Sequence, residues 1–515
     1  MTRKLRRFVR VWKFYKTRRF QTKSFDPSVR TCRVNIPVPG TFEDGTVRTK
    51  QEPELLNLGE AMFADAKLGD RRRSKRLALL FEQVRKHPGG TLPHKLKAPA
   101  DLKALYRFCA SKGVTHNAII DAMRQYALGR VNPDADTVLI LHDATELDYT
   151  SIRSLDDQLG QIGKGGGRGY ICQNSLAVTE DEGEILGLTN QILHQRADVP
   201  ENETLPESRE RESRESLLWL RGTEGLPAEW RFVDVCDQGA DTFEFLEHEF
   251  LSGRRFVVRS KRQRCVYLGH EERGTRGPLC EQVDQLRQLG HRTLKIQSQK
   301  GKCHRRAREA KLVVQAGPIL IPRPHARHGN YQGVTMPIWA VRVFEPKPPR
   351  GEEALEWVLL TNQPVATFDE ALRVVGWYES RWIIEELHKA MKTGCAIENM
   401  QFTATSRLEP MIAVLSAVAT TLLNLRAASR REDAMTRPAT DVISVEYVQV
   451  LSGWRCLRVR SDLTIHEFFY ALARLGGHQN RRSDKRPGWL VLWRGWMTLH
   501  AMLDGAEAIQ RTKCG

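Results

Sequence analysis

The chain has 515 residues, of which 41% are hydrophobic and 28% are charged. This composition excludes an intrinsically disordered chain, and the length suggests about three domains of roughly 150 residues each. The net charge of +18 and the isoelectric point near 9.6 favour a polyanionic partner such as nucleic acid. The ten cysteines include no C-x-x-C pair, which excludes a zinc knuckle and a disulfide framework and fits a reducing cytoplasm.

Residues 1–50 form a basic extension in which aromatic side chains are interspersed. They hold 14 Lys and Arg against 3 Asp and Glu, a balance of +11, which leaves +7 for the other 465 residues. We expect either a flexible arm that binds DNA phosphates without sequence specificity or a dispensable tail. Its charges leave no room for the apolar segment of a signal peptide, so export is not expected.

Residues 51–118 are expected to form a small helical domain. Apolar side chains recur at helical spacing through this region. Asp70 is placed to cap a helix that begins with Arg71 and Arg72, two residues suited to gripping DNA phosphates. The alternative for these arginines is an ordinary solvated helix face.

Short β-rich runs alternate with helical ones from residue 119 to residue 429, which predicts an α/β catalytic domain. A stretch from about 261 to 357, rich in Val, Ile, Gly and Pro, is expected to be a β-rich insertion. The segment Lys164–Gly169 lacks the residue order of a phosphate-binding loop, so we interpret it as a turn between strands. The expected strands are 138–141, 171–178, 185–193, 230–235 and 256–258.

Two further segments have features of a membrane span or a metal site. The longest apolar stretch, Met411 to Leu425, is interrupted by polar residues and is shorter than the roughly 20 residues that span a bilayer. We therefore expect a buried helix and no membrane partner. Cys303 and His304 are adjacent, and neighbours in sequence rarely bind one ion together, so ordinary surface residues are the better interpretation.

Two aspartates follow apolar strand-like runs. Asp143 comes after Val138–His142, and Asp237 comes after Phe232–Cys236. Carboxylates at strand ends of an α/β sheet are suited to Mg²⁺, which prefers oxygen ligands. Each aspartate alone is weak evidence, because Asp is also common after strands as a turn residue or helix cap.

A third acidic residue lies in a segment of helical composition. Tyr378, Arg381, Glu385 and Lys392 are three, four and seven residues apart, which places them within an arc of about 60° on one helix. Apolar side chains gather on the opposite side of the same wheel. An amphipathic helix with an exposed ion pair between Arg381 and Glu385 is the alternative interpretation.

The order strand-Asp, strand-Asp, helix-Glu resembles that of bacterial cut-and-paste DDE transposases of the insertion-sequence-four group, to which the transposon-five transposase belongs. The family signature Tyr-x2-Arg-x3-Glu-x6-Lys is met by Tyr378, Arg381, Glu385 and Lys392. The resemblance extends from about residue 55 to residue 508. Its departures are Gln238 and Gly239 in place of a common Arg-Glu, Leu58 in place of a Trp, and the basic extension.

The resemblance implies a ribonuclease-H-like catalytic core with an end-binding helical domain before it. Asp143, Asp237 and Glu385 would be the catalytic residues and would hold two Mg²⁺ ions, for which Mn²⁺ would substitute. Trp357 would stack on a flipped base, or would instead be a core aromatic that opens a strand. The implied DNA contacts are Tyr378, Arg381, Lys389, Lys392, Trp357, Arg259, Arg71 and Arg72.

The implied reaction is cut-and-paste transposition at the terminal inverted repeats of the element itself. A metal-dependent endonuclease would nick double-stranded DNA, form and open a hairpin, and join the end to target DNA. The setting would be the bacterial cytoplasm, at the nucleoid when bound to DNA. Two other classes stay open: a non-catalytic DNA-binding protein derived from a transposase, and a ribonuclease-H-like nuclease that cuts without joining.

The resemblance also implies a helical dimerisation domain at residues 430–515 and a homodimer on two DNA ends. Apolar residues recur there at helical spacing. Burial within one subunit is the alternative interpretation of that stripe, which consists of Leu492, Trp493, Trp496, Leu499, Met502 and Leu503.

Overall fold

The computed structural model describes residues 58–181, 183–197, 202–261, 264–296, 306–324, 332–481, 484 and 486–513. All described residues belong to one compact unit, Glu52–Gly515. The expected basic arm at 1–50 and the pair Cys303 and His304 lie outside the described residues. The expected boundaries after 118 and 429 stay predictions, and helix α5 (His116–Leu128) crosses the first of them.

The first part of the described chain is helical, as predicted from its periodicity. Apolar side chains one turn apart meet in its core, where Phe63 and Phe81 pack edge to face with ring centroids 5.5 Å apart. Asp70 caps α2 as expected, because its carboxylate accepts a hydrogen bond from the Arg72 backbone N–H at 2.8 Å. The helices are α1 (Leu58–Phe63), α2 (Arg71–Lys86), α3 (Leu92–Lys95), α4 (Pro99–Cys109) and α5.

A 12-stranded mixed sheet forms the centre of the described residues, so the fold is mixed α/β. Its order is β2-β3-β1-β5-β6-β12-β11-β10-β7-β8, with β4 paired to β3 and β9 paired to β10. The pairs β1–β5 and β5–β6 are parallel. The strands are β1 (Val138–Asp148), β2 (Gly160–Ile162), β3 (Gly167–Thr179), β4 (Ile185–His194), β5 (Phe232–Cys236), β6 (Arg255–Arg259), β7 (Cys265–Leu268), β8 (Arg276–Pro278), β9 (Arg287–Ile296), β10 (Arg308–Ile321), β11 (Met336–Phe344) and β12 (Glu356–Thr361).

The expected strands are confirmed, and all but the first lie within four residues of their predicted ends; β1 continues well past Leu141, to Asp148. The segment from Lys164 to Gly166 is a turn between β2 and β3, also as expected. The β-rich stretch from 261 to 357 is present, but its strands extend the central sheet, because β11 pairs with β12 and β12 pairs with β6.

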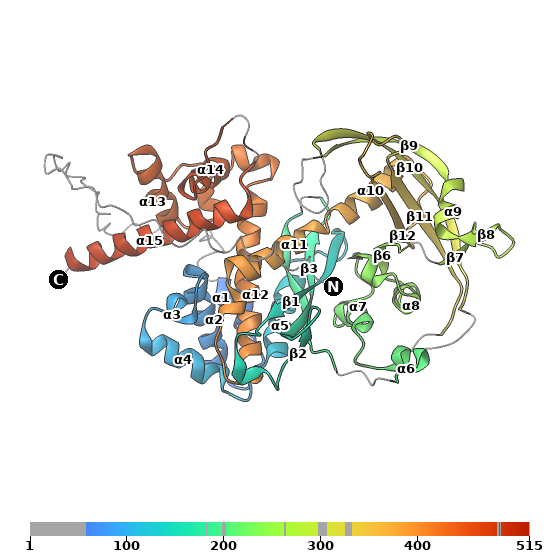
Figure 1. Ribbon diagram of the computed structural model, residues 1–515. Coiled ribbons are helices and arrows are strands. Elements are labelled where there is room, and N and C mark those ends of the chain that lie inside the picture. Colours follow the sequence, from blue (N-terminus) through green and yellow to red (C-terminus); the bar gives the residue numbers. More distant parts are fainter. Residues whose placement is uncertain are drawn as a thin grey trace, which may run out of the picture. The chain divides into compact units, whose positions relative to one another are not determined.

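Helices cover both faces of the sheet. Figure 1 shows α11 and α12, in orange, beside the sheet, where α11 contacts β1 and α12 contacts β4, and the main hydrophobic core lies on this face. A second core lies on the other face, against α8. The helices after β4 are α6 (Leu205–Glu210), α7 (Leu218–Gly222), α8 (Phe243–Leu251), α9 (Leu279–Gln282), α10 (Phe368–Glu379), α11 (Trp382–Lys389), α12 (Thr405–Ala428), α13 (Val445–Cys456), α14 (Ile465–Leu475) and α15 (Trp489–Lys513).

Helix α12 contains the apolar stretch that the sequence singled out. It is long and apolar enough to cross a membrane, but 83% of its most apolar window is buried inside the chain. Its side chains pack in the main core beside the sheet. The expectation of a buried helix is therefore confirmed.

The apolar stripe of α15 packs within its own chain. Trp493, Trp496 and Leu499 are 8%, 5% and 0% exposed, and they belong to the main core together with α14 side chains. The interpretation of this stripe as a dimer interface is wrong for these residues, because their side chains are already covered. Met502 and Leu503, further along the helix, are half-buried.

Candidate active site

Asp143 and Asp237 lie just beyond the parallel pairing of β1 with β5. Leu141 pairs with Val235, so two further residues on each chain bring Asp143 and Asp237 side by side. Strand β5 ends before Asp237, as predicted, whereas β1 continues past Asp143 because it stays paired with β3 as far as Asp148. Asp143 therefore ends the parallel pairing and not the strand, which corrects the prediction.

The turn after β5 fixes the carboxylate of Asp237. Asp237 Oδ1 accepts a hydrogen bond from the Gly239 N–H at 2.6 Å, which caps a short 3₁₀ turn. The side chain of Gln238 turns away and donates to the Ser260 carbonyl at 3.1 Å. A Cβ on Gly239 would lie 2.6 Å from the Trp219 ring and 2.9 Å from Asp237 Oδ1. This turn therefore excludes a side chain at the position where the family that the sequence resembles often carries Glu.

The signature residues come from four consecutive segments and not from one regular helix, which corrects the prediction. Tyr378 lies near the end of α10, Arg381 lies in the turn before α11, and Glu385 lies in α11. Lys392 belongs to a π-helical turn, Ala390–Gly394. The apolar side of α11 is packed as expected, with Ile384 fully buried.

Arg381 joins two of the three acidic residues. Its Nη1 donates to Asp143 Oδ2 at 3.0 Å, and its Nη2 forms an ion pair with Glu385. Burial raises the pKa of Asp143 to about 6; the charge of Arg381 opposes this rise, while those of Asp237 and Glu385 add to it. Burial lowers the pKa of Arg381, but the charges of Asp143 and Glu385 raise it by more. The pKa of Arg381 therefore lies above its usual value. Asp143 and Glu385 thus share one cation, and the charge of Asp237 acts on Asp143.

The donor set has the chemistry of a site for hard divalent cations, since all its ligands are carboxylate oxygens. Among the described residues, however, no three His, Cys, Asp or Glu side chains converge as the ligands of one ion. The guanidinium of Arg381 lies between Asp143 and Glu385 instead. These carboxylates would bind a metal ion only with the Arg381 side chain moved aside.

Two predicted DNA-contact residues are in contact with each other. The rings of Trp357 and Tyr378 meet edge to face, with centroids 5.4 Å apart. Trp357 lies near the start of β12 and is half-buried against the main core, so it is also the strand-opening aromatic of the alternative interpretation. Tyr378 comes three residues, or about one helical turn, before Arg381, so the ring pair adjoins the segment that carries this arginine.

The lysines of the signature segment point to other partners. Lys392 pairs with Glu398 at 3.2 Å, and Lys389 pairs with Glu386 at 3.0 Å. Arg259 ends β6, two residues after Val257, which pairs with Val235 of β5. Since side chains alternate along a strand, Arg259 faces the same side of the sheet as Asp143.

Two buried polar networks flank Asp143, and sequence reasoning missed both. On the face of the sheet opposite to the Asp143 side chain, His142 Nε2 lies 2.8 Å from Asp234 Oδ1, and Asp234 also accepts a hydrogen bond from Arg254 Nε at 2.9 Å. On the same face as the Asp143 side chain, Asn174 contacts His388, with 3.2 Å between the Asn174 amide nitrogen and His388 Nε2. The available signal was a polar residue inside an otherwise apolar strand, such as Asp234 in β5.

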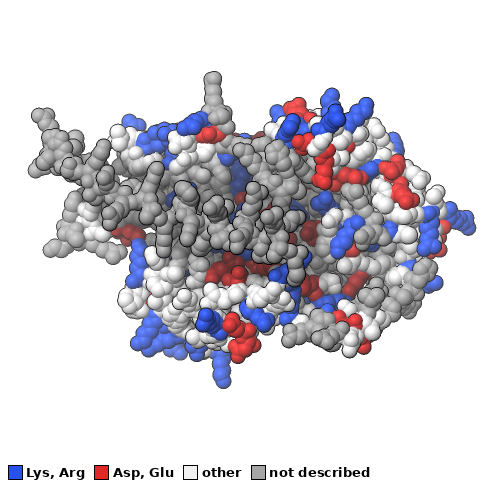
Figure 2. Space-filling model, viewed as in Figure 1, with Lys and Arg blue, Asp and Glu red and all other residues white. Residues whose placement is uncertain are grey.

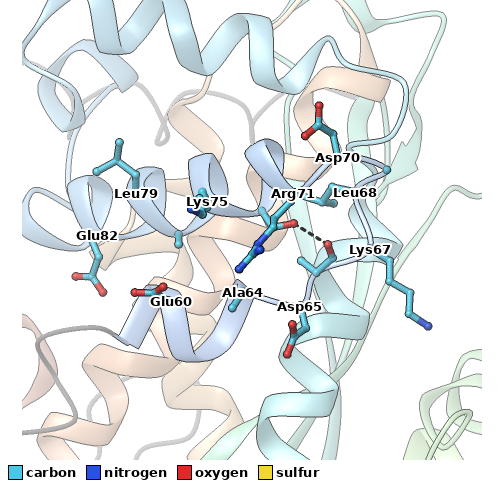
Figure 3. Close-up of a pocket in the computed structure, with 14 residues that line it drawn as sticks. Glu60, Ala64, Asp65, Lys67, Leu68, Asp70, Arg71, Lys75, Leu79 and Glu82 are labelled. Atoms are coloured by element: carbon cyan, nitrogen blue, oxygen red, sulfur yellow. Dashed lines mark hydrogen bonds between the residues drawn. The ribbon is translucent and has the colours of Figure 1, made fainter.

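A hollow of about 670 Å³ lies between α1 and α2 in the helical part. Figure 3 shows Glu60, Ala64 and Asp65 on one wall and Arg71 and Lys75 on α2. The side chain of Arg72 is 91% exposed and pairs with Asp70 at 2.9 Å.

Basic side chains also gather around α4. In Figure 2, Lys and Arg are concentrated at the lower left, over the region where Figure 1 places this helix. Lys103 and Arg107 of α4 are both exposed. The helical part thus presents cations on more than one helix.

Residues 59–114 match the family model described as "Transposase DNA-binding". The match covers α2, α3 and α4 and all of α1 except its first residue. It supports a DNA-binding transposase and a DNA partner for this chain. The exposed arginines and lysines of α2 and α4 lie inside the matched range.

Proposed function

We propose that the chain is a cut-and-paste DDE transposase of the insertion-sequence-four group, with a ribonuclease-H-like core. The observation that carries the proposal is Arg381, which joins Asp143 to Glu385 while Asp237 lies beside Asp143. This arrangement occurs in a chain whose residues 59–114 match a transposase DNA-binding family. The substrate would be the terminal inverted repeats of its own element.

Asp143, Asp237 and Glu385 would hold two Mg²⁺ ions, or Mn²⁺ in their place. Divalent ions bound there would activate the attacking oxygen and stabilise the leaving oxygen of an in-line phosphoryl transfer. Arg381 would exchange its carboxylate partners for a DNA phosphate, to which a guanidinium can donate two parallel hydrogen bonds. The negative carboxylates so released are the ligands that the ions require.

The aromatic pair supports the finer proposal of a hairpin intermediate. Hairpin formation requires the end of the duplex to be distorted, and an aromatic face compensates for lost base stacking. Trp357 would provide that face, supported from behind by Tyr378 at 5.4 Å. Nicking, hairpin formation, hairpin opening and strand transfer would follow at one site, in the cytoplasm of a bacterium.

A homodimer on two DNA ends remains part of the proposal, but with a different surface. The α15 stripe is covered by its own chain. Leu490 and Ile509 lie on the same helix and are 47% and 57% exposed. We expect the dimer contacts among such outward residues and not at Trp493 or Trp496.

The decisive experiment is cleavage of DNA that carries the inverted repeats of the element, with Mg²⁺ or Mn²⁺ present. We expect Asp143→Ala, Asp237→Ala and Glu385→Ala each to abolish cleavage, because removing any one ligand disables the metal site. End binding, measured by gel shift without metal, should be unchanged. Retained cleavage by any of the three variants would remove that residue from the site.

Glu386→Ala is the matched control, since Glu386 adjoins Glu385 on α11 but pairs with Lys389 and Arg426. It should keep metal-dependent cleavage at a temperature where it is folded. A wild-type chain that binds ends but cuts no DNA would indicate a non-catalytic derivative. Cleavage without joining in a strand-transfer assay would indicate a nuclease.

A further inference from the structure

A row of buried polar side chains crosses the sheet beside Asp143. Asn174 of β3 pairs with Asp143 of β1, and Gln191 of β4 pairs with Asn174. Directly opposed residues of antiparallel strands point to the same face, so the three side chains form one row. Asn174 is fully buried and Gln191 is 2% exposed. The row lies on the face that α11 and α12 cover.

Hydrogen bonds run along this row in one direction, from α5 to α11. His116 Nε2 lies 3.0 Å from Gln191 Oε1, and the Gln191 amide donates to Asn174 Oδ1 at 2.7 Å. The Asn174 amide nitrogen lies 3.2 Å from His388 Nε2. Because an amide oxygen only accepts, His116 is protonated on Nε2; because the Asn174 amide donates, His388 accepts on Nε2.

The last member of the row belongs to the helix that carries Glu385. His388 follows Glu385 by three residues, so the two side chains are neighbours on the helix surface. Ile384 and Leu387, both fully buried, add apolar contacts, while Arg381 hydrogen-bonds to Asp143 just before the helix and Glu386 pairs with Arg426 of α12. Apolar contacts are non-directional, whereas a buried donor without a partner is costly. The buried Asn174–His388 hydrogen bond is therefore one of the directional contacts that select the rotation of α11, and it is the one that links this helix to β3.

We propose that Asn174 and His388 are positioning residues, which hold α11 in the rotation that sets Glu385 opposite Asp143. The inference rests on the proposed function, because the alignment it explains is that of two metal-binding carboxylates. Burial lowers the pKa of His388 to about 3, an effect to which the charges of Lys392 and Arg381 add. The ring is thus neutral at physiological pH and stays an acceptor.

The row also begins at a surface cavity. His116 and Gln191 line a cavity of about 580 Å³, together with Arg124 and Glu409. The hydrogen bonds therefore connect α5, which follows the matched DNA-binding region, to the helix of Glu385. Gln191 is further fixed by a hydrogen bond to Ser416 Oγ of α12 at 2.9 Å.

The test compares two replacements of His388 in the full chain. His388→Gln keeps an acceptor at the end of the side chain, whereas His388→Met fills a similar volume without a comparable acceptor. Binding of Mn²⁺ is measured by calorimetry on the full chain bound to an already cleaved end duplex, whose phosphate can take Arg381 from its carboxylates, and cleavage of intact ends is then measured over a range of Mn²⁺ concentrations. We expect His388→Met to raise the Mn²⁺ dissociation constant about tenfold or more, as is typical for residues that orient metal ligands. His388→Gln should stay close to the wild type.

Thr420→Val is the matched control for stability. Thr420 is 5% exposed on α12, and its hydroxyl donates to the Ser416 carbonyl at 2.8 Å. It should lower the unfolding temperature and leave Mn²⁺ binding unchanged. If His388→Met behaves in the same way, with a lowered unfolding temperature and unchanged Mn²⁺ affinity, the inference is overturned.

A second variant covers the case in which His388→Met does not fold. Asn174→Ser shortens the donor on the β3 side, and it should weaken Mn²⁺ binding in the same direction; unchanged affinity would again overturn the inference. Failure of the proposed function is seen separately, in the wild-type chain. A wild type that neither binds Mn²⁺ nor cuts DNA refutes that function before any variant is compared.

Discussion

Gly239 is the residue on which the setting of Asp237 depends. A Cβ there would lie 2.6 Å from the Trp219 ring and 2.9 Å from Asp237 Oδ1. We predict that Gly239→Ala displaces the Asp237 carboxylate and lowers single-turnover cleavage roughly tenfold or more, because small misplacements of reacting groups are costly. Overpacking should also lower the free energy of unfolding by about 1–3 kcal/mol, measured by urea denaturation.

Gly505→Ala is the control for this substitution. Gly505 lies in α15, and a Cβ there meets no atom within 4 Å. It should leave cleavage unchanged and stabilise the helix by up to about 1 kcal/mol, since Ala is the better helix former. A wild-type cleavage rate in Gly239→Ala would show that the turn does not set Asp237.

Residue type and order single out three acidic groups that lie within electrostatic range of one another in the structure, but they do not predict what holds these groups in place. Arg381 was considered as a partner of Glu385, and its second partner, Asp143, lies 238 residues away. The buried run Gln173-Asn174-Ser175 has no alternation in polarity, because each face of β3 receives polar partners. A period of two cannot reveal burial where both faces are polar.

The beginning of α2 is the element that we expect to meet DNA phosphates first. Arg71 is exposed there, inside the matched DNA-binding region. We predict that Arg71→Ala weakens binding to duplexes of any sequence. It should also reduce the slope of log K against log salt by about 0.9, the value for one lost phosphate contact. Fluorescence anisotropy between 50 and 200 mM salt, roughly the range over which such slopes are resolved, would measure it.

Lys86→Ala is the control within the same helix. Lys86 is exposed in the last turn of α2, so Lys86→Ala removes the same charge as Arg71→Ala, but from the opposite end of the helix. It should leave the salt slope close to that of the wild type. Equal slopes in the two variants would mean that α2 binds through its overall charge and not through its first turn.

Periodicity predicted the existence of the elements better than their ends. Strand β1 is longer than its apolar run because β3 pairs with it as far as Asp148, and such pairing is a tertiary property. The break between α10 and α11 carries no Gly or Pro as a signal. Arg381 N donates to the Tyr378 carbonyl at 3.1 Å, in a 3₁₀ turn, while the Arg381 side chain reaches Asp143. The prediction from residue spacing treated Tyr378 to Lys392 as one unbroken helix.

At the scale of the whole molecule, three parts of the sequence meet at the end of the π-helical turn. A Cβ on Gly394 would lie 3.4 Å from Trp489, and one on Gly89 would lie 3.2 Å from Met497. The DNA-binding region, the segment after Glu385 and α15 therefore share one packed junction. Contacts between such distant residues leave no periodic signal, which is why the stripe of α15 could be interpreted equally as a dimer interface.

Lys95 lies in this junction, and its ionisation should make stability depend on pH. It is 1% exposed, and its Nζ donates to the Cys395 carbonyl at 2.7 Å and to the Pro88 carbonyl. Burial lowers its pKa to about 8 from 10.5. Between these values only the unfolded chain holds the proton, so the free energy of unfolding should rise with pH, by about 3 kcal/mol in total. Below about pH 8, Lys95 is protonated in the folded chain as well, so the full free-energy cost of its buried charge is present there.

We predict that Lys95→Met removes this rise, because methionine carries no proton to lose. Urea denaturation at several pH values from about 7 to 10.5, the range that brackets both pKa values, would measure it. Lys97→Met is the control: the side chain of Lys97 is 59% exposed and pairs with Asp504, so this variant should keep the rise. If Lys95→Met showed the same pH dependence as the wild type, Lys95 would be charged in the folded chain throughout. Its two carbonyl partners would then offset the whole cost of burial, and the junction between the DNA-binding region and the segment after Glu385 would hold equally well at every pH.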